Sequence, residues 1–372
     1  MAYYKLVFET SLPYQLRKKM PHKIVQILLA WYDEYKRTLP WRKNYPHINP
    51  YFTWLSEIML QQTTVATVIP YFYTFIKKWP TLSELAAAKR DDVLHSWQGL
   101  GYYNRAHKLH ECSILLSKEY NNIFPKSYDE LIKLPGIGPY TAAAISAIAF
   151  NKPIPVVDGN VERLISRLYA LQIPKKHLKK KASEILKDFP LKHRPGDIAQ
   201  SMMDFANSIC TASKPKCLIC PLKRYCKAYQ KALVEKIPQK KDKRNTTRYA
   251  HFLIIQRKDN NKILLYKRPL RGLLPGLMAF ISTEWKKNDW PDPCAFYSPF
   301  IKNYRNIVWL DSYVNHTFTH FHLQSRIGIY KTPSSKIEDV PFSETQWIHP
   351  NQLDNYALPT LMKKIIIAAK IT

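Results

Sequence analysis

Apolar residues recur at helical spacing through the first two thirds of the chain. In VVDGNVERLISRLYAL, for example, the apolar positions Val161, Leu164, Ile165 and Leu168 follow the i, i+3, i+4, i+7 rule of one helix face. Short breaks between such segments carry proline or glycine, as in LPGIGP and NKPIPVVDGN. The pattern therefore predicts a mainly helical region over residues 28–229.

The pattern of apolar residues along the chain changes after a short basic segment. Residues 236–248, KIPQKKDKRNTTR, contain six basic residues and one acidic residue with little apolar content, which is typical of a linker. The segments beyond it, such as YAHFLIIQ and SRIGIYK, are short and rich in β-branched and aromatic residues, which predicts strands. We therefore expect an N-terminal extension, a helical domain, a linker and a smaller α+β domain, at residues 1–22, 23–235, 236–248 and 249–372.

Composition narrows the class of partner. The chain has 372 residues and a net charge of +29, yet 46% of its residues are hydrophobic, so it can form a core. Such an excess of positive charge favours a polyanionic partner, with nucleic acid ahead of an acidic membrane surface. No apolar run approaches the length of a membrane span, and the N-terminus lacks the features of a signal peptide. We expect a cytoplasmic protein without a membrane partner.

Four of the six cysteines lie close together. They form a C-x6-C-x2-C-x5-C pattern, made by Cys210, Cys217, Cys220 and Cys226. Four thiolates at this spacing can converge on one metal centre, because disulfides are disfavoured in a reducing cytoplasm. Structural zinc sites usually use two close pairs, so the single close pair favours an iron–sulfur cluster. Zinc and buried cysteines without a ligand stay open as alternatives.

Two further motifs place chemical groups at predicted helix starts. In LPGIGPYT, Gly136 and Gly138 can take positive φ and bring a phosphate close to backbone N–H groups, although a lone G-x-G is often only a turn. Twenty residues after Gly138, Asp158 begins another helix, where a plain N-cap is the alternative.

In WLSEIMLQQTT, Glu57 stands among apolar residues. A solvated glutamate would be ordinary there, but burial would raise its pKa and keep it protonated, as a general acid requires.

The cysteine spacing, the glycine hairpin and Asp158 together resemble the endonuclease III superfamily of helix-hairpin-helix DNA glycosylases. The resemblance implies a [4Fe–4S] cluster on the four cysteines and a DNA phosphate held by the hairpin amides. It also implies that Asp158 stabilises positive charge at C1′ of the target nucleotide. Members that also cut the strand carry a lysine directly before the hairpin threonine. Here Tyr140 occupies that position, and we include it among the predicted catalytic residues. Because tyrosine has no amine to form a Schiff base, strand cleavage is expected to be weak or absent.

The segment SEIMLQQTTV resembles the adenine DNA glycosylases, and Glu57 falls on the catalytic glutamate of that family. The resemblance implies that adenine is flipped out of the duplex and protonated at N7 by Glu57. Asp158 then stabilises the sugar cation, and water completes the hydrolysis. Asn160, Arg42 and Asp204 match residues that line the adenine pocket or order its water.

Other positions match contacts around the lesion on the opposite strand. Gln62, Thr63 and Leu100 correspond to such contacts, and Tyr102 corresponds to an aromatic wedge, with core packing as its plain alternative. HTFTHFHL stands where the family has a loop that contacts 8-oxoguanine, and it supplies Phe318, Thr319 and His320. RPLRGLLPGL resembles the start of a Nudix-like domain. The acids that follow it are too scattered to hold Mg²⁺, so we expect no pyrophosphohydrolysis.

The sequence thus predicts a multidomain protein. An all-α helix-hairpin-helix glycosylase domain with an iron–sulfur cluster loop precedes a smaller α+β Nudix-like domain. We expect a monomeric, monofunctional base excision repair enzyme that acts on double-stranded DNA with 8-oxoguanine:adenine or guanine:adenine mispairs, at a bacterial-type nucleoid. The alternatives are a bifunctional glycosylase/lyase, which Tyr140 and the C-terminal domain disfavour, and a non-catalytic DNA-binding module, which Glu57 and Asp158 disfavour.

Overall fold

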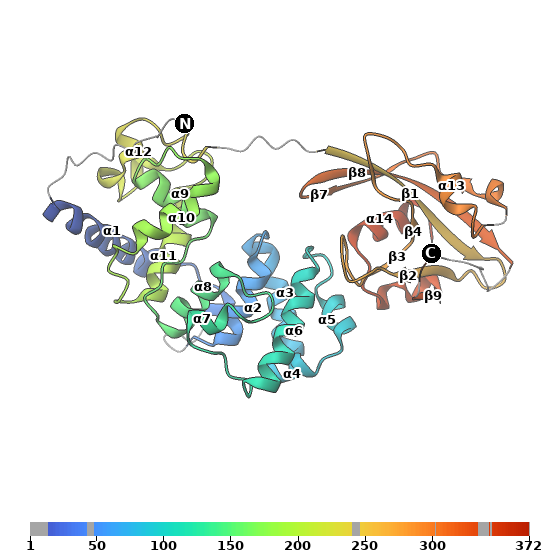
Figure 1. The fold of residues 1–372 in the computed structure, drawn as a ribbon, viewed down its shortest axis with the longest axis horizontal. Coiled ribbons are helices and arrows are strands. Elements are labelled where there is room, and N and C mark those ends of the chain that lie inside the picture. Colours follow the sequence, from blue (N-terminus) through green and yellow to red (C-terminus); the bar gives the residue numbers. More distant parts are fainter. Residues whose placement is uncertain are drawn as a thin grey trace, which may run out of the picture. The chain divides into compact units, whose positions relative to one another are not determined.

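The computed structural model describes residues 14–42, 48–239, 246–301, 303–333, 342 and 344–371. The chain forms two compact units (Figure 1). Unit 1 comprises Met1–Gln62 and Leu115–Asp242, and unit 2 comprises Thr63–Ile114 and Lys243–Thr372. No helix within these described ranges is long and apolar enough to cross a membrane.

Unit 1 is helical, as the apolar periodicity predicts. Its longer helices are α1 (Tyr14–Tyr35), α2 (Pro50–Leu60), α8 (Pro139–Phe150), α9 (Gly159–Leu168), α10 (Lys175–Leu186) and α11 (Pro195–Ser208). Shorter turns complete it at η1 (Pro40–Arg42), α7 (Tyr128–Leu131), η2 (Cys217–Ile219), η3 (Lys223–Tyr225) and α12 (Lys227–Gln230). The core of this unit contains apolar side chains of α1, α8, α9 and α11.

Close packing of α8 against α11 sets the geometry around the candidate site. α8 contributes a run of buried alanines, and the second residue of α11 is a buried glycine, Gly196. A Cβ atom at Gly196 would lie 2.9 Å from the carbonyl oxygen of Ala147 and 3.0 Å from Cα of Ile148. Glycine is therefore required at this position for the two backbones to approach.

The predicted N-terminal extension is partly helical. α1 begins at Tyr14, within residues 1–22, and continues into the helical domain. Ile24 and Leu28 of α1 are fully buried in the core that α11 also joins. A helix anchored there can extend toward the N-terminus, because each added residue forms a hydrogen bond without a new nucleation cost. Residues 1–13, residues 43–47 and residues 240–245 of the predicted linker lie outside the described residues.

Unit 2 combines helices with a sheet. The helices are α3 (Val65–Lys78), α4 (Leu82–Ala87), α5 (Arg90–Ser96), α6 (Asn104–Glu119, which ends in unit 1), α13 (Pro293–Tyr297) and α14 (Thr360–Ala368), with turns η4 (Tyr304–Asn306) and η5 (Pro350–Asn355). The strands are β1 (Thr246–Arg257), β2 (Ile263–Lys267), β3 (Met278–Ala279), β4 (Ile281–Ser282), β5 (Lys286–Lys287), β6 (Val308–Trp309), β7 (Val314–Phe318), β8 (Phe321–Thr332) and β9 (Thr345–Ile348).

The strands form one mixed sheet around a long parallel pair. The main order is β3-β2-β1-β8-β6, and β1 and β8 pair in parallel from Thr246↔Phe321 to Arg257↔Thr332. β7 and β8 form an antiparallel hairpin in which Phe318 pairs with Phe321, so residues 319 and 320 lie at its tip. The predicted class, a helical region followed by a separate α+β region, is confirmed, although β1 begins within the predicted linker.

Candidate active site

Glu57 is buried in the interior of unit 1. Its helix, α2, is capped by the Asn49 side chain, which accepts the amide of Tyr51, and most of its residues are buried. The Tyr140 hydroxyl, from α8, donates to Glu57 Oε2 at 2.8 Å. Burial raises the pKa of Glu57 to about 7, while this hydrogen bond lowers it and the charge of Asp158 raises it. The alternative of a solvated glutamate is therefore wrong, and Glu57 can hold a proton near neutral pH.

Asp158 is held rigidly at the start of α9. Its Oδ1 accepts the amides of Asn160 at 2.9 Å and Val161 at 2.7 Å, so it is indeed an N-cap. Its Oδ2 accepts the side-chain amide of Asn160 at 2.7 Å. The charge of Asp158 also contributes to the raised pKa values of Glu57 and Tyr140, so the cap lies close to the buried acid. Capping and a catalytic role are compatible in this arrangement.

Arg42 and Asp204 pair directly. Arg42 Nη1 donates to Asp204 Oδ2 at 2.7 Å, and Asp204 is 1% exposed in α11. Burial acts to raise the pKa of Asp204, but hydrogen bonds and charge from Arg42 and Arg37 hold it below its usual value. Arg37 Nε donates to Asp204 Oδ1 at 2.8 Å. Sequence reasoning missed Arg37, whose only signal is its place five residues before Arg42.

The glycine hairpin takes a different conformation from the prediction at one of its two glycines. Gly136 has a φ of 74°, as expected. Gly138, in contrast, has a φ of −89° and a ψ of 179°, so it is extended and serves as the N-cap of α8. No atom lies within 4 Å of a Cβ built on Gly138, so the space in front of this helix start is open. The expectation of positive φ is correct for Gly136 and wrong for Gly138.

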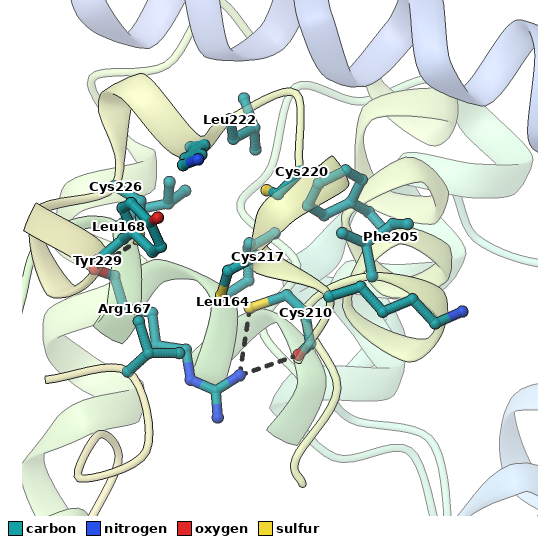
Figure 2. A pocket seen from close by; sticks show the side chains of 14 residues that line it. Leu164, Arg167, Leu168, Phe205, Cys210, Cys217, Cys220, Leu222, Cys226 and Tyr229 are labelled. Atoms are coloured by element: carbon teal, nitrogen blue, oxygen red, sulfur yellow. Dashed lines mark hydrogen bonds between the residues drawn. The ribbon is translucent and has the colours of Figure 1, made fainter. Parts of the chain in front are cut away.

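The four clustered cysteines surround one cavity (Figure 2). The other side chains that line this cavity include Leu164, Phe205 and Leu222. Burial raises the pKa of Cys220 to about 12 and also raises those of Cys217 and Cys226. Bare thiols would therefore stay protonated here, and only a bound positively charged group would favour the thiolates. Among the described residues, no three His, Cys, Asp or Glu side chains are grouped as ligands of a single metal ion.

Two arginines on α9 connect the cysteine loop to its surroundings. Arg163 donates to the carbonyl of Cys210 at 2.9 Å and to Asn160 Oδ1 at 3.1 Å. Arg167, which is fully buried, donates to the Thr211 carbonyl at 2.7 Å and approaches Cys210 Sγ at 3.4 Å. Sequence reasoning missed both residues. The sequence feature that could have indicated them is a pair of arginines one turn apart on a helix with an apolar face.

Unit 2 brings five other predicted residues together. They line one cavity of about 460 Å³, here called the hairpin cavity: Leu100, Tyr102, Phe318, Thr319 and His320. The hydroxyl groups of Tyr102 and Thr319 form a hydrogen bond. Tyr102 is partly exposed with a φ of 49°, so the core-packing alternative does not hold for it, whereas Tyr103 is buried.

Gln62 and Thr63 fall at the boundary between the two units. Gln62 is exposed and follows α2 with a left-handed φ of 58°. Thr63 is partly buried. The lesion contacts expected for these two residues stay predictions.

Three family models match successive parts of the chain. Residues 55–188 match the HhH-GPD superfamily of base excision DNA repair proteins. Residues 210–226 match the iron–sulfur binding domain of endonuclease III, and residues 251–368 match the NUDIX domain.

Individual proteins are similar over longer stretches. The adenine DNA glycosylase of Buchnera aphidicola subsp. Baizongia pistaciae is 41% identical over 259 residues, which cover 68% of this chain and 72% of that protein. The human adenine DNA glycosylase is 30% identical over 408 residues, which cover 91% of this chain and 72% of that protein. Among solved structures, a thermostable thymine-DNA glycosylase is 26% identical with a TM-score of 0.50, covering 58% of this chain and 98% of its own.

Burial of Glu57 predicts a specific dependence of stability on pH. Folding raises its pKa from 4.5 to about 7, so the folded state binds this proton more tightly than the unfolded state. The contribution of Glu57 to stability is therefore fully present below pH 4.5 and is lost as pH rises through about 7. Glu57→Gln removes this dependence. The free energy of unfolding of the variant minus that of the wild type should increase by about 3 kcal/mol between pH 4.5 and pH 8.

Urea denaturation of both proteins across this pH range measures the difference. The exposed Glu119→Gln serves as a control and should leave the difference constant. A Glu57→Gln difference that does not change with pH would show that Glu57 is already ionised at neutral pH.

Proposed function

The chain belongs to the adenine DNA glycosylase family, and on this premise we propose that it removes adenine opposite 8-oxoguanine or guanine in double-stranded DNA. The family makes it a base excision repair enzyme that hydrolyses N-glycosidic bonds. The observation that carries the proposal is the buried Glu57, whose pKa of about 7 and contact with Tyr140 suit a general acid. The net charge of +29 supports binding to the DNA backbone.

Glu57 supplies the proton in this proposal. Adenine leaves more easily when N7 is protonated, because the base then departs as a neutral molecule. Tyr140 holds Glu57 Oε2, which leaves Oε1 as the oxygen that is available to carry the proton to the base. An acid whose pKa lies near the working pH is both protonated in the resting enzyme and able to give up its proton.

Asp158 supplies the negative charge. Loss of the base leaves an oxocarbenium-like sugar, and a fixed carboxylate next to C1′ lowers the energy of that cation. Three hydrogen bonds from Asn160 and Val161 hold the carboxylate of Asp158 in one orientation. The two acids thus divide the work, because one is kept protonated by burial and the other is held by polar groups.

The absence of an amine at position 140 supports a monofunctional reaction. Burial raises the pKa of Tyr140 well above its usual value, so its phenol stays neutral and donates to Glu57. A phenol cannot form a Schiff base with C1′ of the sugar, and we therefore expect hydrolysis without strand cleavage at this site. The same contact disfavours the bifunctional glycosylase/lyase alternative.

We propose that the hairpin cavity reads the lesion strand. Tyr102 would enter the base stack as a wedge, and the tip of the β7–β8 hairpin would contact 8-oxoguanine through Thr319 and its neighbours. Support comes from the exposure of Thr319 and His320 at that tip and from the hydrogen bond between Thr319 and Tyr102. The hydroxyl of Thr319 can serve as a hydrogen-bond partner of the lesion base.

The iron–sulfur cluster is proposed to be [4Fe–4S]. Four cysteines surround one cavity, and residues 210–226 match the iron–sulfur binding domain of endonuclease III, which supports a cluster rather than zinc. When bound, such a cluster cross-links the loop through its four thiolates. Arg163 then connects the Cys210 carbonyl to Asn160, so the loop supports the turn that holds Asp158. A monomeric state and a location at the nucleoid in the cytoplasm stay predictions.

Glu57→Gln tests the reaction. Single-turnover release of adenine should fall by at least about 100-fold from duplexes with 8-oxoguanine:adenine and guanine:adenine, because the amide cannot donate an acid proton. Affinity for the same mispaired duplexes should stay close to that of the wild type. Thymine:adenine duplexes should release no base, and Glu119→Gln should behave as the wild type. Full activity of Glu57→Gln would exclude the acid role.

Thr319→Val tests the reading of the lesion. Valine has the shape of threonine without its hydroxyl, so the preference for 8-oxoguanine:adenine over guanine:adenine should fall by about tenfold. The ratio of the two single-turnover rates gives the preference directly. Thr345→Val, at an exposed position of strand β9, is the matched control. If Thr319→Val keeps the wild-type ratio, the hairpin tip does not read 8-oxoguanine through this hydroxyl.

Elemental analysis tests the cluster. The purified protein should be brown and contain about four iron and four sulfide ions per chain. Cys220→Ser should lose both, since serine replaces one of the four ligands, whereas the exposed Cys294→Ser should retain them. A colourless protein with one zinc ion would overturn the assignment.

A further inference from the structure

Arg105 lies beside Tyr102, the residue proposed as the wedge, and has no role in the proposed function. It is the second residue of α6 and is partly buried. Its Cζ atom lies 5.3 Å from the centre of the Trp97 ring and 5.5 Å from the centre of the Tyr102 ring. The Trp97 side chain is fully buried, whereas Tyr102 is partly exposed. Arg105 thus connects the partly exposed ring to a fully buried one.

The same guanidinium holds the backbone just before Tyr102. Arg105 Nη2 donates to the carbonyl of Leu100 at 3.3 Å and to that of Gly101 at 3.2 Å. The Trp97 indole Nε1 also donates to the Gly101 carbonyl, at 3.0 Å. Both lone pairs of this carbonyl are therefore used, which fixes the orientation of the peptide group that precedes Tyr102.

The backbone that Arg105 holds has an unusual conformation. Within residues 97–103, here called the wedge loop, φ is 101° at Gly99, 71° at Gly101 and 49° at Tyr102. Glycine adopts positive φ readily, but a bulky aromatic residue does so at a cost in free energy. Such a conformation persists only where surrounding contacts determine it. The contacts of Arg105 are therefore expected to stabilise the left-handed backbone at Tyr102.

Other contacts fix the first half of the wedge loop. The Tyr71 hydroxyl donates to the Gln98 carbonyl at 2.7 Å, and the Gly99 amide donates to the Tyr103 hydroxyl at 3.2 Å. A Cβ atom on Gly99 would overlap the Tyr71 hydroxyl, so this position also requires glycine for space. Arg105 is left to fix the half of the loop that carries the wedge ring.

The contacts of Arg105 need a planar cation. Burial lowers its pKa to about 10, so the guanidinium is still charged at neutral pH. A cation near the face of an aromatic ring is attracted by the electron density of the ring, and the attraction grows as water is excluded. Lysine would keep the charge but offers neither the flat surface nor the fork of N–H donors.

We propose that Arg105 is a positioning residue that fixes the wedge loop and presents the ring of Tyr102 to DNA in one orientation. The inference rests on the proposed wedge role of Tyr102. Arg105 acts on DNA through that ring and does not contact DNA itself, because its guanidinium already contacts two rings and two carbonyls. A ring that is held in place before binding inserts without the cost of ordering a mobile loop.

Arg105→Met tests the proposal in the full-length, cluster-containing protein. Methionine keeps the apolar stem and removes the guanidinium, so single-turnover release of adenine from 8-oxoguanine:adenine duplexes should slow by about tenfold. The fraction of enzyme that reacts should stay the same, because the fold is retained. Thermal unfolding checks the fold. Arg105→Lys, which is less disruptive, should give an intermediate rate constant.

A double-mutant cycle shows whether Arg105 acts through the ring. Tyr102→Ala should also slow the release of adenine, and adding Arg105→Met to it should change the rate constant by less than about twofold. A further tenfold loss in the double variant would overturn the proposal, since Arg105 would then act independently of Tyr102. A wild-type rate constant in Arg105→Met beside a slow Tyr102→Ala would also overturn it, and would leave the wedge role intact.

Failure of the wedge role itself gives a different result. If Tyr102→Ala releases adenine as fast as the wild type, the wedge role is wrong, and the positioning role is overturned with it. The proposed base release by Glu57 is not affected by that outcome, because Glu57→Gln tests it separately.

Fluorescence supplies a readout that a general loss of stability would not change. A duplex with 2-aminopurine next to 8-oxoguanine should brighten when the wild type binds, since insertion of the wedge unstacks the probe. Arg105→Met at saturating concentration should lose most of this increase, as Tyr102→Ala should. Arg90→Met, at an exposed arginine of α5 in the same unit, is the matched control and should behave as the wild type.

Salt dependence separates positioning from a phosphate contact. If Arg105 binds a DNA phosphate, Arg105→Met should weaken binding to fully paired duplexes and lower the slope of log affinity against log salt by about one. That result would overturn the proposal. We expect an unchanged slope and unchanged affinity for paired DNA.

Discussion

Burial of one carboxylic acid is the constraint on which unit 1 depends. Removing Glu57 from water raises its pKa to about 7, because a low-dielectric interior disfavours the charged form. A buried acid is costly unless its polar atoms are paired, and the Tyr140 hydroxyl provides that pairing. Water is excluded only if α2, α8 and α11 pack closely. The small residues of α8 and the glycine at Gly196 permit this approach.

The second carboxylate is held by the opposite means. Asp158 accepts hydrogen bonds from amides at the N-terminus of α9, where the helix dipole favours a negative charge. One acid is therefore buried and the other is capped, which suits the two different tasks proposed for them at a single pH. Arg163 donates to the Cys210 carbonyl and to Asn160, which in turn holds Asp158, so hydrogen bonds connect the cysteine loop to the cap of α9.

In unit 2 the candidate residues are positioned by strand register, whereas in unit 1 Asp158 is positioned by helix capping. The parallel pairing of β1 and β8 over twelve residues determines where β8 begins, and hence where the β7–β8 hairpin places Thr319. The rings of Phe318, Phe321 and Trp285 then pack against one another beside the hairpin tip. This region matches the NUDIX domain, and a shared fold does not by itself determine which chemistry its residues perform.

The sequence by itself predicted the class of fold and proposed candidate reactive residues. Helical periodicity, the change to short strands and the cysteine spacing act over a few positions, so they predicted the fold class, and motif resemblance proposed Glu57 and Asp158 as the two acids. The tertiary structure decided which side chains contact one another. Tyr140 meets Glu57 across 83 positions and Arg37 meets Asp204 across 167, and Gly138 is extended where positive φ was expected. Such contacts, and the burial that raises the pKa of Glu57, depend on how whole helices pack, which no local pattern encodes.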